Sequence, residues 1–358
     1  MTHPAVLRAL AFAKDYGLRV PILMAPMAGA CPPALASAVA DAGGMGACGT
    51  VMMPPDAIKS WAIQMRAASN GAFQLNTWIP DPDPVRDPEN EAALRDFLSA
   101  WGPDVPAEAI EDTGQDFMHQ CEAMLAAGPA VMSSIMGLYP PDVVAAFKTR
   151  GIRWFATVTT VAEARAAVDA GADVIVAQGA EAGGHRGAFN AQDGEDQTIG
   201  LMSLVPAVVD AVDVPVVATG GIADGRTAAA ALLLGASAVQ IGTALLRSPE
   251  AGIPSAWADA IGAADPETTR TTRAFSGRLG RALDTEFLRA SHAKEAPTLA
   301  PFPIQRALTA PMRANGAAKN DLSRINTWAG QSAGLAQARP AKDIIETLWT
   351  ETQTLLRG

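Results

Sequence analysis

Cysteine is scarce in this sequence and forms no pattern that would hold a metal. Only Cys31, Cys48 and Cys121 occur among 358 residues, without a CxxC pair or a cysteine/histidine pattern. A structural zinc site is therefore not expected, and we predict no metal. The odd count and the lack of an export signal predict reduced thiols. Because no histidine or basic residue is adjacent to any of them, we interpret them as small buried hydrophobic residues.

Long hydrophobic runs are also missing. The longest early apolar stretch, residues 9–13, lies between Arg8 and Lys14 and is too short for the core of a signal peptide. No later segment approaches the run of about 18 apolar residues that a membrane-spanning helix needs. We therefore expect a cytoplasmic protein that does not enter a membrane.

Positive charge is outnumbered by negative charge. The chain has 27 Lys and Arg against 37 Asp and Glu, which gives a formal net charge of −10. This balance gives no support to a nucleic acid or an anionic membrane surface as a partner. We expect a small-molecule ligand. A homodimer is the candidate assembly. The 49% apolar content allows a well-buried core.

Eight short apolar segments recur along the chain, and most are followed by an alanine-rich stretch of helical period. They cover residues 21–26, 44–48, 72–76, 130–134, 153–157, 173–177, 215–219 and 238–242. Strands that are apolar on both faces are typical of parallel sheets covered by helices. Eight such β-then-α units are what a closed barrel requires, so the sequence favours an α/β fold, the (β/α)8 TIM barrel.

An open, doubly wound parallel sheet is the structural alternative. In its dinucleotide-binding form, a Gly-x-Gly-x-x-Gly motif follows the first strand. Here the residues after the first strand, 28–33, read AGACPP. The absence of the motif favours the barrel over the open sheet.

Two stretches fall outside the eightfold pattern. Residues 80–118 begin with PDPDPVRDPEN, which cannot lie inside a strand or a helix, so we predict an excursion between the third and fourth strands. Residues 250–358 follow the last strand and are long enough for several helices. We therefore predict a barrel domain over residues 1–249 and a helical subdomain over residues 250–358 that packs at the barrel mouth.

Glycines follow the last two predicted strands, at the end of a barrel where catalytic and binding groups lie. Gly220 and Gly221 follow the seventh strand, and Gly242 and Thr243 follow the eighth. Backbone amides at these places commonly hold a phosphate, and glycine lets the backbone approach it closely. The alternative is that these glycines only form tight turns. We favour a ligand that carries a phosphate.

Other strand ends distinguish a flavin from a sugar phosphate. Asn76 ends the third strand and Gln178 follows the sixth, and each carries an amide that both donates and accepts hydrogen bonds. Such amides suit the pyrimidine edge of an isoalloxazine, although either could instead cap its own loop. The first strand ends at Ala25, and the turn at Pro26 and Met27 offers a flat, apolar wall for a planar ring. This set favours flavin mononucleotide (FMN).

One histidine lies among four glycines in the segment AQGAEAGGHRGAF, directly after the sixth strand. This residue, His185, can be neutral and remove a proton, or be charged and attract an anion. The glycines allow the backbone to curl over a ligand edge without side-chain clashes. A histidine that merely bonds its own loop is the alternative. We predict that His185 is the catalytic residue.

The chain resembles the nitronate monooxygenases, formerly called 2-nitropropane dioxygenases, a family of flavin-dependent barrel enzymes. The motifs that carry the resemblance are PILMAPMAGA, FQLNTW, VIVAQGAEAGGHRG, VPVVATGGIADG, AVQIGTALL and NTWAGQSAGLA, which span about residues 20–337. The resemblance implies that His185 lies beside the flavin. It also implies that FMN is held by Asn76, Gln178, Gly183, Gly220, Gln240, Ile241, Gly242 and Thr243.

The resemblance further implies a reaction. An alkyl nitronate such as propionate 3-nitronate would be oxidised by O2 to an aldehyde or keto compound and nitrite, without a nicotinamide. For a neutral nitroalkane His185 would act as a base, and for a preformed nitronate it would chiefly position the anion. The late segment WAGQS, residues 328–332, either folds back to the flavin or substrate end or packs in the core.

Two other functions fit the same residues. A flavin-dependent enoyl-acyl-carrier-protein reductase resembles this family in fold and in its Gly-Gly-His loop. It would need NADH and a basic surface for an acidic carrier protein, which a net charge of −10 disfavours. The other is a phosphate-ligand barrel without redox chemistry, which a flavin absorption band in the purified protein would eliminate.

Overall fold

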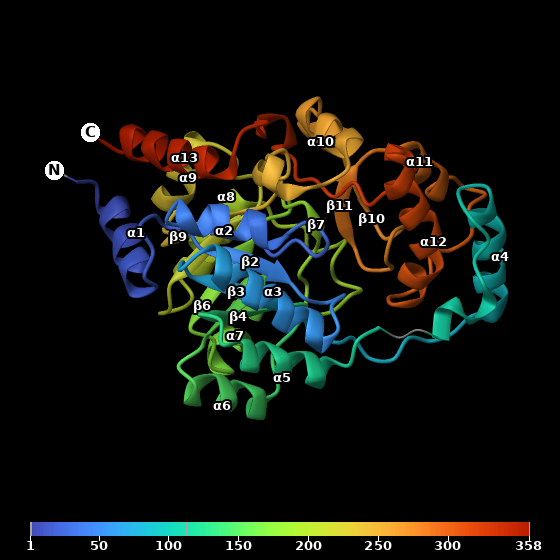
Figure 1. The fold of residues 1–358 in the computed structure, drawn as a ribbon, viewed down its shortest axis with the longest axis horizontal. Helices are drawn as coiled ribbons and strands as arrows, with labels where there is room; N and C mark the ends of the chain where they lie inside the picture. The colour runs from blue at the N-terminus through green and yellow to red at the C-terminus, as the bar shows by residue number, and fades with distance from the viewer. Residues whose placement is uncertain (1, 112–113, 358) are drawn as a thin grey trace.

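The computed structural model describes residues 2–111 and 114–357, and its largest element is an eight-stranded parallel sheet. The strands are β1 (Ile22–Met24), β2 (Gly46–Gly49), β3 (Phe73–Trp78), β4 (Val131–Ile135), β5 (Arg153–Val158), β6 (Val174–Gln178), β8 (Val216–Thr219) and β9 (Ala238–Ile241). They are ordered β1-β9-β8-β6-β5-β4-β3-β2, and a parallel bridge between Leu23 and Met45 brings β1 back to the start of β2. The predicted (β/α)8 barrel is confirmed, and each predicted strand segment overlaps an observed strand (Figure 1).

A ring of helices covers the outside of the barrel. It consists of α2 (Pro33–Asp41), α3 (Pro55–Ala68), α5 (Phe117–Ala127), α6 (Pro141–Thr149), α7 (Val161–Asp169), α8 (Leu201–Val209) and α9 (Gly225–Leu233). Local sequence explains where several of them begin: α2, α3 and α6 start with proline, whose fixed φ suits the first turn. A capping box between Thr160 and Glu163 starts α7.

The first helix, α1 (Pro4–Asp15), closes the amino-terminal end of the barrel. Phe12 packs with Phe155 of β5 at a ring-centroid distance of 6.3 Å, and Tyr16 meets the same ring edge-on at 5.1 Å. Phe12, Leu23, Met45 and Phe155 belong to one buried cluster inside the barrel. The opposite, carboxyl end of the strands is therefore left for ligands.

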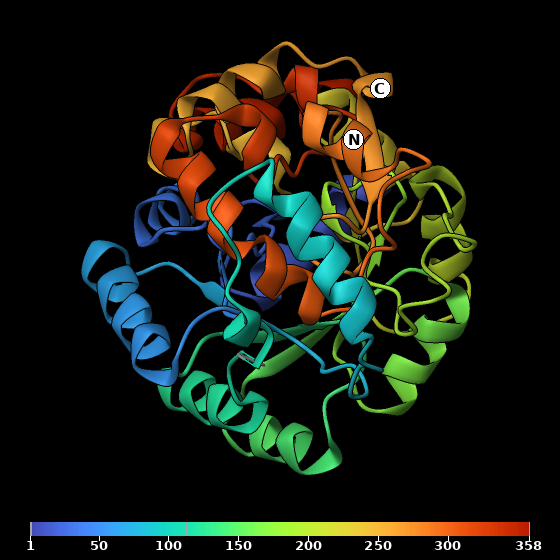
Figure 2. The ribbon, with the colours of Figure 1, turned by 90° about the vertical axis from the view of Figure 1, so that its right-hand side faces the viewer.

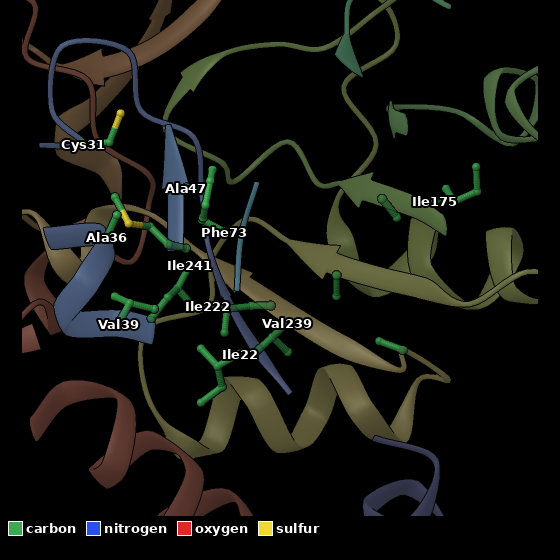
Figure 3. Packing of buried hydrophobic residues seen from close by; sticks show 14 of the residues in the cluster. Ile22, Cys31, Ala36, Val39, Ala47, Phe73, Ile175, Ile222, Val239 and Ile241 are labelled. Atoms are coloured by element: carbon green, nitrogen blue, oxygen red, sulfur yellow. The ribbon is translucent and has the colours of Figure 1, made fainter. Parts of the chain in front are cut away.

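The larger core lies between the strands and the helical ring. Figure 3 shows part of it, where Ile241 of β9 lies beside Ala36 and Val39 of α2. Ile22 and Val239 belong to the same cluster. Alternate residues of each strand point into the barrel and out toward the helices, which is why these strands are apolar along both faces.

The excursion after β3 and the chain after β9 pack against each other at the carboxyl end of the barrel. The excursion contains α4 (Pro88–Ser99) and η1 (Ala107–Glu111), and the later chain contains α12 (Ile304–Lys319). Leu94 and Leu98 of α4 share a buried cluster with Leu308 and Met312 of α12. In Figure 2, these cyan and orange-red helices cross in front of the ring of barrel helices.

The chain after β9 is not entirely helical. Besides α12 it contains α10 (Ser255–Gly262), α11 (Glu286–Ser291), short 3-10 turns and two strands, β10 (Thr269–Thr272) and β11 (Gly280–Leu283). These strands form an antiparallel sheet with β7 (Gly184–His185), in the order β10-β11-β7. This sheet had no signal in the sequence and was not predicted. The turns are η2 (Thr243–Leu245), η3 (Pro249–Ala251), η4 (Pro266–Thr268), η5 (Leu322–Arg324) and η6 (Ala333–Leu335).

The last helix, α13 (Ala341–Leu355), returns to the barrel. It packs against α9 and α2, the place that an eighth barrel helix would occupy. The division into a barrel domain over residues 1–249 and a helical subdomain over residues 250–358 stays a prediction. Both termini lie at the end of the molecule away from α4 and α12 (Figure 1). None of the helices within residues 2–111 and 114–357 is both long and apolar enough to cross a membrane.

Candidate active site

A cavity of about 550 Å³ opens at the carboxyl end of the strands, between the barrel and the chain after β9. This volume lies in the range of small-molecule and cofactor sites. The predicted residues that line it are Ala25, Pro26, Met27, Asn76, Gln178, Gly183, His185, Gly220, Gly221, Gln240, Gly242 and Thr243. Ile241 does not line it, because its side chain is 1% exposed and packs outward in the core.

Five backbone amides at one end of the cavity have no backbone acceptor. They belong to Gly183, Gly220, Gly221, Gly242 and Thr243, and none donates to a backbone carbonyl within the described part of the chain. Gly220 and Gly221 have φ of +113° and +68°, values that residues with a Cβ rarely adopt. Convergent unpaired amides form a concave site for an anion such as a phosphate.

The segment 328–332 folds back onto this end of the cavity, which was the first of the two alternatives for it. The amide of Gly330 donates to Thr243 Oγ1 at 3.0 Å, and Ser332 Oγ donates to the carbonyl of Gly221 at 2.8 Å. Trp328 both lines the cavity and packs against Phe275, with ring centroids 5.2 Å apart. The segment therefore holds the two glycine turns in place.

The three predicted amide side chains line the cavity but already have partners in the protein. Asn76 Nδ2 donates to Ser133 Oγ at 3.1 Å, and Gln240 Oε1 accepts from the side chain of Gln74 at 3.1 Å. Gln178 braces the loop after β6: its Nε2 donates to the carbonyl of His185 at 3.0 Å and its Oε1 accepts from Gly187 at 2.8 Å. Each amide keeps capacity for a further hydrogen bond to a ligand.

The imidazole of His185 has three side-chain contacts. Its ring contacts the rings of Trp78 and Trp328, with centroid distances of 4.5 and 4.7 Å. Its Nε2 is 2.7 Å from Ser276 Oγ. The backbone of His185 pairs with Gly280 of β11, so the small sheet aligns the histidine loop with the chain after β9.

The surroundings of His185 keep it uncharged. Burial lowers the pKa of His185 to about 3, and the positive charges of Arg278, Arg313 and Arg306 lower it further. The imidazole is therefore neutral at physiological pH and can accept a proton. Of the two states that the sequence allowed, the structure favours the neutral one.

Arg313 brings a desolvated positive charge into the same cavity. Its Nε donates to Thr309 Oγ1 at 3.1 Å and its Nη2 to the carbonyl of Arg306 at 2.9 Å, which fixes the guanidinium plane. Burial and the neighbouring Arg306 lower the pKa of Arg313 to about 10. No carboxylate among the described residues forms an ion pair with Arg313. A charge held in this way favours an anionic ligand in the cavity.

Three residues that line the cavity were not predicted from the sequence: Trp78, Ser276 and Arg313. Trp78 had a local signal, because it lies two residues after Asn76 and therefore on the same face of β3. Ser276 and Arg313 had none, because they come close to His185 only through the packing of the chain after β9.

Solved structures share this architecture over nearly the whole chain. Nitroalkane oxidase from Streptomyces ansochromogenes matches with a TM-score of 0.88 and 35% identity, over 96% of this chain and 99% of that one. FabK from Thermotoga maritima matches with a TM-score of 0.75 and 28% identity, over 96% of both chains. The enoyl reductase domain of MlnA from Bacillus amyloliquefaciens, with a TM-score of 0.64 and 14% identity over 97% of both chains, shows a similar fold.

Sequence relatives point to one family. A nitronate monooxygenase from Paraburkholderia phytofirmans is 36% identical over 94% of this chain and 93% of its own length. A probable nitronate monooxygenase from Bacillus subtilis is 33% identical over 95% of this chain and 98% of its own. Residues 12–351 match the nitronate monooxygenase family as a whole. The chain thus belongs to the nitronate monooxygenase family, the flavin-dependent oxidoreductases that oxidise nitronates.

Proposed function

We propose that this protein binds FMN and uses O2 to oxidise an alkyl nitronate, such as propionate 3-nitronate, to an aldehyde or keto compound and nitrite. The observation that carries the proposal is the arrangement of the cavity. The unpaired amides of the glycine turns lie at one end, and a neutral His185 lies where the loop after β6 meets the chain after β9. Family membership supports the same chemistry.

The residues at the strand ends fit FMN. The amides of Gly183, Gly220, Gly221, Gly242 and Thr243 would hold the phosphate, because each offers an N–H without a backbone acceptor. Ala25, Pro26 and Met27 would form the wall for the ring, and Asn76, Gln178 and Gln240 would bind its polar edge. The side chain of Ile241 would not contact FMN, and its backbone would only position the neighbouring cavity residues. When bound, FMN supplies the electron acceptor.

His185 has a different task for each form of substrate. A neutral nitroalkane must lose a proton from the carbon next to its nitro group, and the neutral imidazole can take that proton. A preformed nitronate has already lost it and needs no base, so the uncharged imidazole of His185 would serve only as part of the wall beside that anion. Trp78 and Trp328 contact the imidazole in both cases and would limit its rotation.

Arg313 supplies the positive charge that an anionic substrate needs. Its guanidinium is fixed by two hydrogen bonds from α12 and lies close enough to lower the pKa of His185. A carboxylate at the far end of a nitronate, as in propionate 3-nitronate, would pair with it and place the nitronate group toward His185.

The proposal is tested by incubating the purified protein with propionate 3-nitronate in air and measuring nitrite and O2 consumption. A flavin absorption band, nitrite release and O2 uptake are expected. The His185→Asn variant should keep FMN and lose turnover of neutral nitroalkanes, while turnover of preformed nitronate persists. A wild-type protein without flavin would overturn the proposal, and unchanged nitroalkane turnover in the variant would show that the histidine loop has another role.

A further inference from the structure

We propose that Ser276 is a positioning residue that keeps the proton of neutral His185 on Nε2, so that Nδ1 is the nitrogen that takes the proton of the substrate. The inference rests on the proposed function in one respect, the use of His185 as a base. It adds which nitrogen of the ring reacts and which residue decides it.

The hydroxyl of Ser276 is buried, at 3% exposure, and has three polar neighbours. His185 Nε2 lies at 2.7 Å. The carbonyl oxygen of Arg278 lies at 3.2 Å, and the amide nitrogen of Arg278 lies at 3.3 Å and donates to Ser276 Oγ. A hydroxyl has one proton to donate and two lone pairs that accept.

The number of protons distinguishes two arrangements. In the first, Ser276 Oγ–H donates to the carbonyl of Arg278 and accepts from both the Arg278 amide and His185 Nε2–H, so that all of these groups are satisfied. In the second, Oγ–H donates to His185 Nε2, and the Arg278 carbonyl loses its hydroxyl donor. Buried polar groups without partners are costly, so the first arrangement is preferred.

The chain next to Ser276 is fixed by the side chain of Arg278. Arg278, two residues later, is 2% exposed, and its guanidinium donates to both carboxylate oxygens of Asp81 at 2.7 and 2.8 Å. Its Nη1 also donates to the carbonyl of Ala188 at 3.0 Å. The turn that carries Ser276 is thus tied to the loop after β3 and to the chain just after His185.

The consequence for the reaction is specific. In a neutral nitroalkane, the C–H bond next to the nitro group breaks, its proton goes to Nδ1 of His185, and its electron pair moves onto the nitro group to form the nitronate. The resulting imidazolium still donates Nε2–H to Ser276 Oγ. Ser276 therefore stabilises the charged ring through the acceptor side of its hydroxyl, close to three arginines that oppose the charge.

The tautomer can be measured without any turnover. Nitrogen NMR of the FMN-bound protein labelled in its histidine rings distinguishes a protonated ring nitrogen from an unprotonated one, and the His185→Asn variant identifies the signals of His185. We expect Nε2 protonated and Nδ1 unprotonated in the wild type, and loss of this preference in Ser276→Ala. A proton on Nδ1 in the wild type, or the same tautomer in Ser276→Ala, would overturn the proposal.

Kinetics provide the second measurement. Ser276→Ala should lower kcat for a neutral nitroalkane roughly 10-fold to 100-fold, and change kcat for a preformed nitronate by less than about 2-fold, because only the first reaction needs the base. Ser276→Thr keeps the hydroxyl and should restore most of the loss. Equal losses with both substrates would show a merely structural role and contradict the proposal.

A matched control is Ser291→Ala in α11. Ser291 is a buried serine whose hydroxyl donates to the carbonyl of Leu288 at 2.9 Å, and it does not line the cavity. This variant should behave like the wild type in both measurements. If the wild type turned over neither substrate, the proposed function would fail, while the NMR measurement would still decide the role of Ser276.

Discussion

Arg278 and Asp81 form a two-bond ion pair that joins the chain after β9 to the loop after β3. The distances are 2.7 and 2.8 Å, and the side chain of Arg278 is 2% exposed. The pair lies close in the chain to two residues that contact His185, because Trp78 precedes Asp81 by three positions and Ser276 precedes Arg278 by two. Two segments that each contact His185 are thus joined by an ionic contact, although they lie almost 200 residues apart in the chain.

Removal of this contact should destabilise the protein. In Asp81→Asn the buried guanidinium of Arg278 loses its charged partner, and we expect a loss of about 3 kcal/mol in the free energy of unfolding. Urea denaturation of the FMN-bound protein measures this change. The exposed pair between Asp56 and Lys59 provides the control, and Asp56→Asn should cost less than about 1 kcal/mol. Equal effects of the two substitutions would show that the buried pair has no special role.

The lowered pKa of His185 predicts an unusual pH profile. A histidine with the ordinary pKa near ~6.5 would be mostly protonated at pH ~5 and would lose about 30-fold in activity as a base. Because burial and three arginines lower the pKa of His185 to about 3, its neutral form persists as the pH falls. We expect kcat for a neutral nitroalkane to stay nearly constant between pH ~8 and ~5. A decline centred near pH ~6.5 would contradict this environment.

The glycine turn after β8 should control the affinity for FMN. Gly221 has φ +68°, and a Cβ there would lie 3.2 Å from Glu181 Cβ. Gly221→Ala should therefore displace the unpaired amides and weaken FMN binding at least about 10-fold, equivalent to about 1.4 kcal/mol. Gly252→Ala is the matched control, because Gly252 has φ +61° but open space around it, away from the cavity. Titration of the flavin-free protein with FMN, followed by flavin fluorescence, measures both affinities.

Arg313 should select substrates by charge. Arg313→Gln removes the positive charge that would pair with a carboxylate, so KM for propionate 3-nitronate should rise roughly 10-fold to 100-fold. KM for a nitronate without a carboxylate should change little. The control is Arg289→Gln on α11, an exposed arginine that does not line the cavity. If KM rose equally for both nitronates, Arg313 would contact the nitronate group itself or support the cavity wall.

The barrel was predictable because its signal is local. A buried parallel strand between two layers is apolar along its whole length, so residues 153–157 and 215–219 stand out without knowledge of their neighbours. The glycines after β8 and β9 were predictable for a similar reason, since a phosphate site needs close backbone approach immediately after a strand. His185 stood out as a histidine between glycines.

The surroundings of His185 were not predictable from the same signals. The strands β10 and β11 contain TRTT and GRAL, which lack an apolar run, and β11 also pairs with the distant histidine loop. Ser276 lies 91 positions from His185, and no spacing in the chain connects the two. Such contacts arise from the packing of the chain after β9 against the barrel, which is a tertiary effect. The cytoplasmic location and the homodimer stay predictions.

The most direct measurement of the central claim is anaerobic mixing of the FMN-bound protein with a preformed nitronate and, separately, with NADH, while the flavin absorption band is recorded. The account predicts that the band changes promptly with the nitronate and remains unchanged with NADH. Reduction by NADH together with no response to the nitronate would contradict the account and favour the enoyl-acyl-carrier-protein reductase alternative.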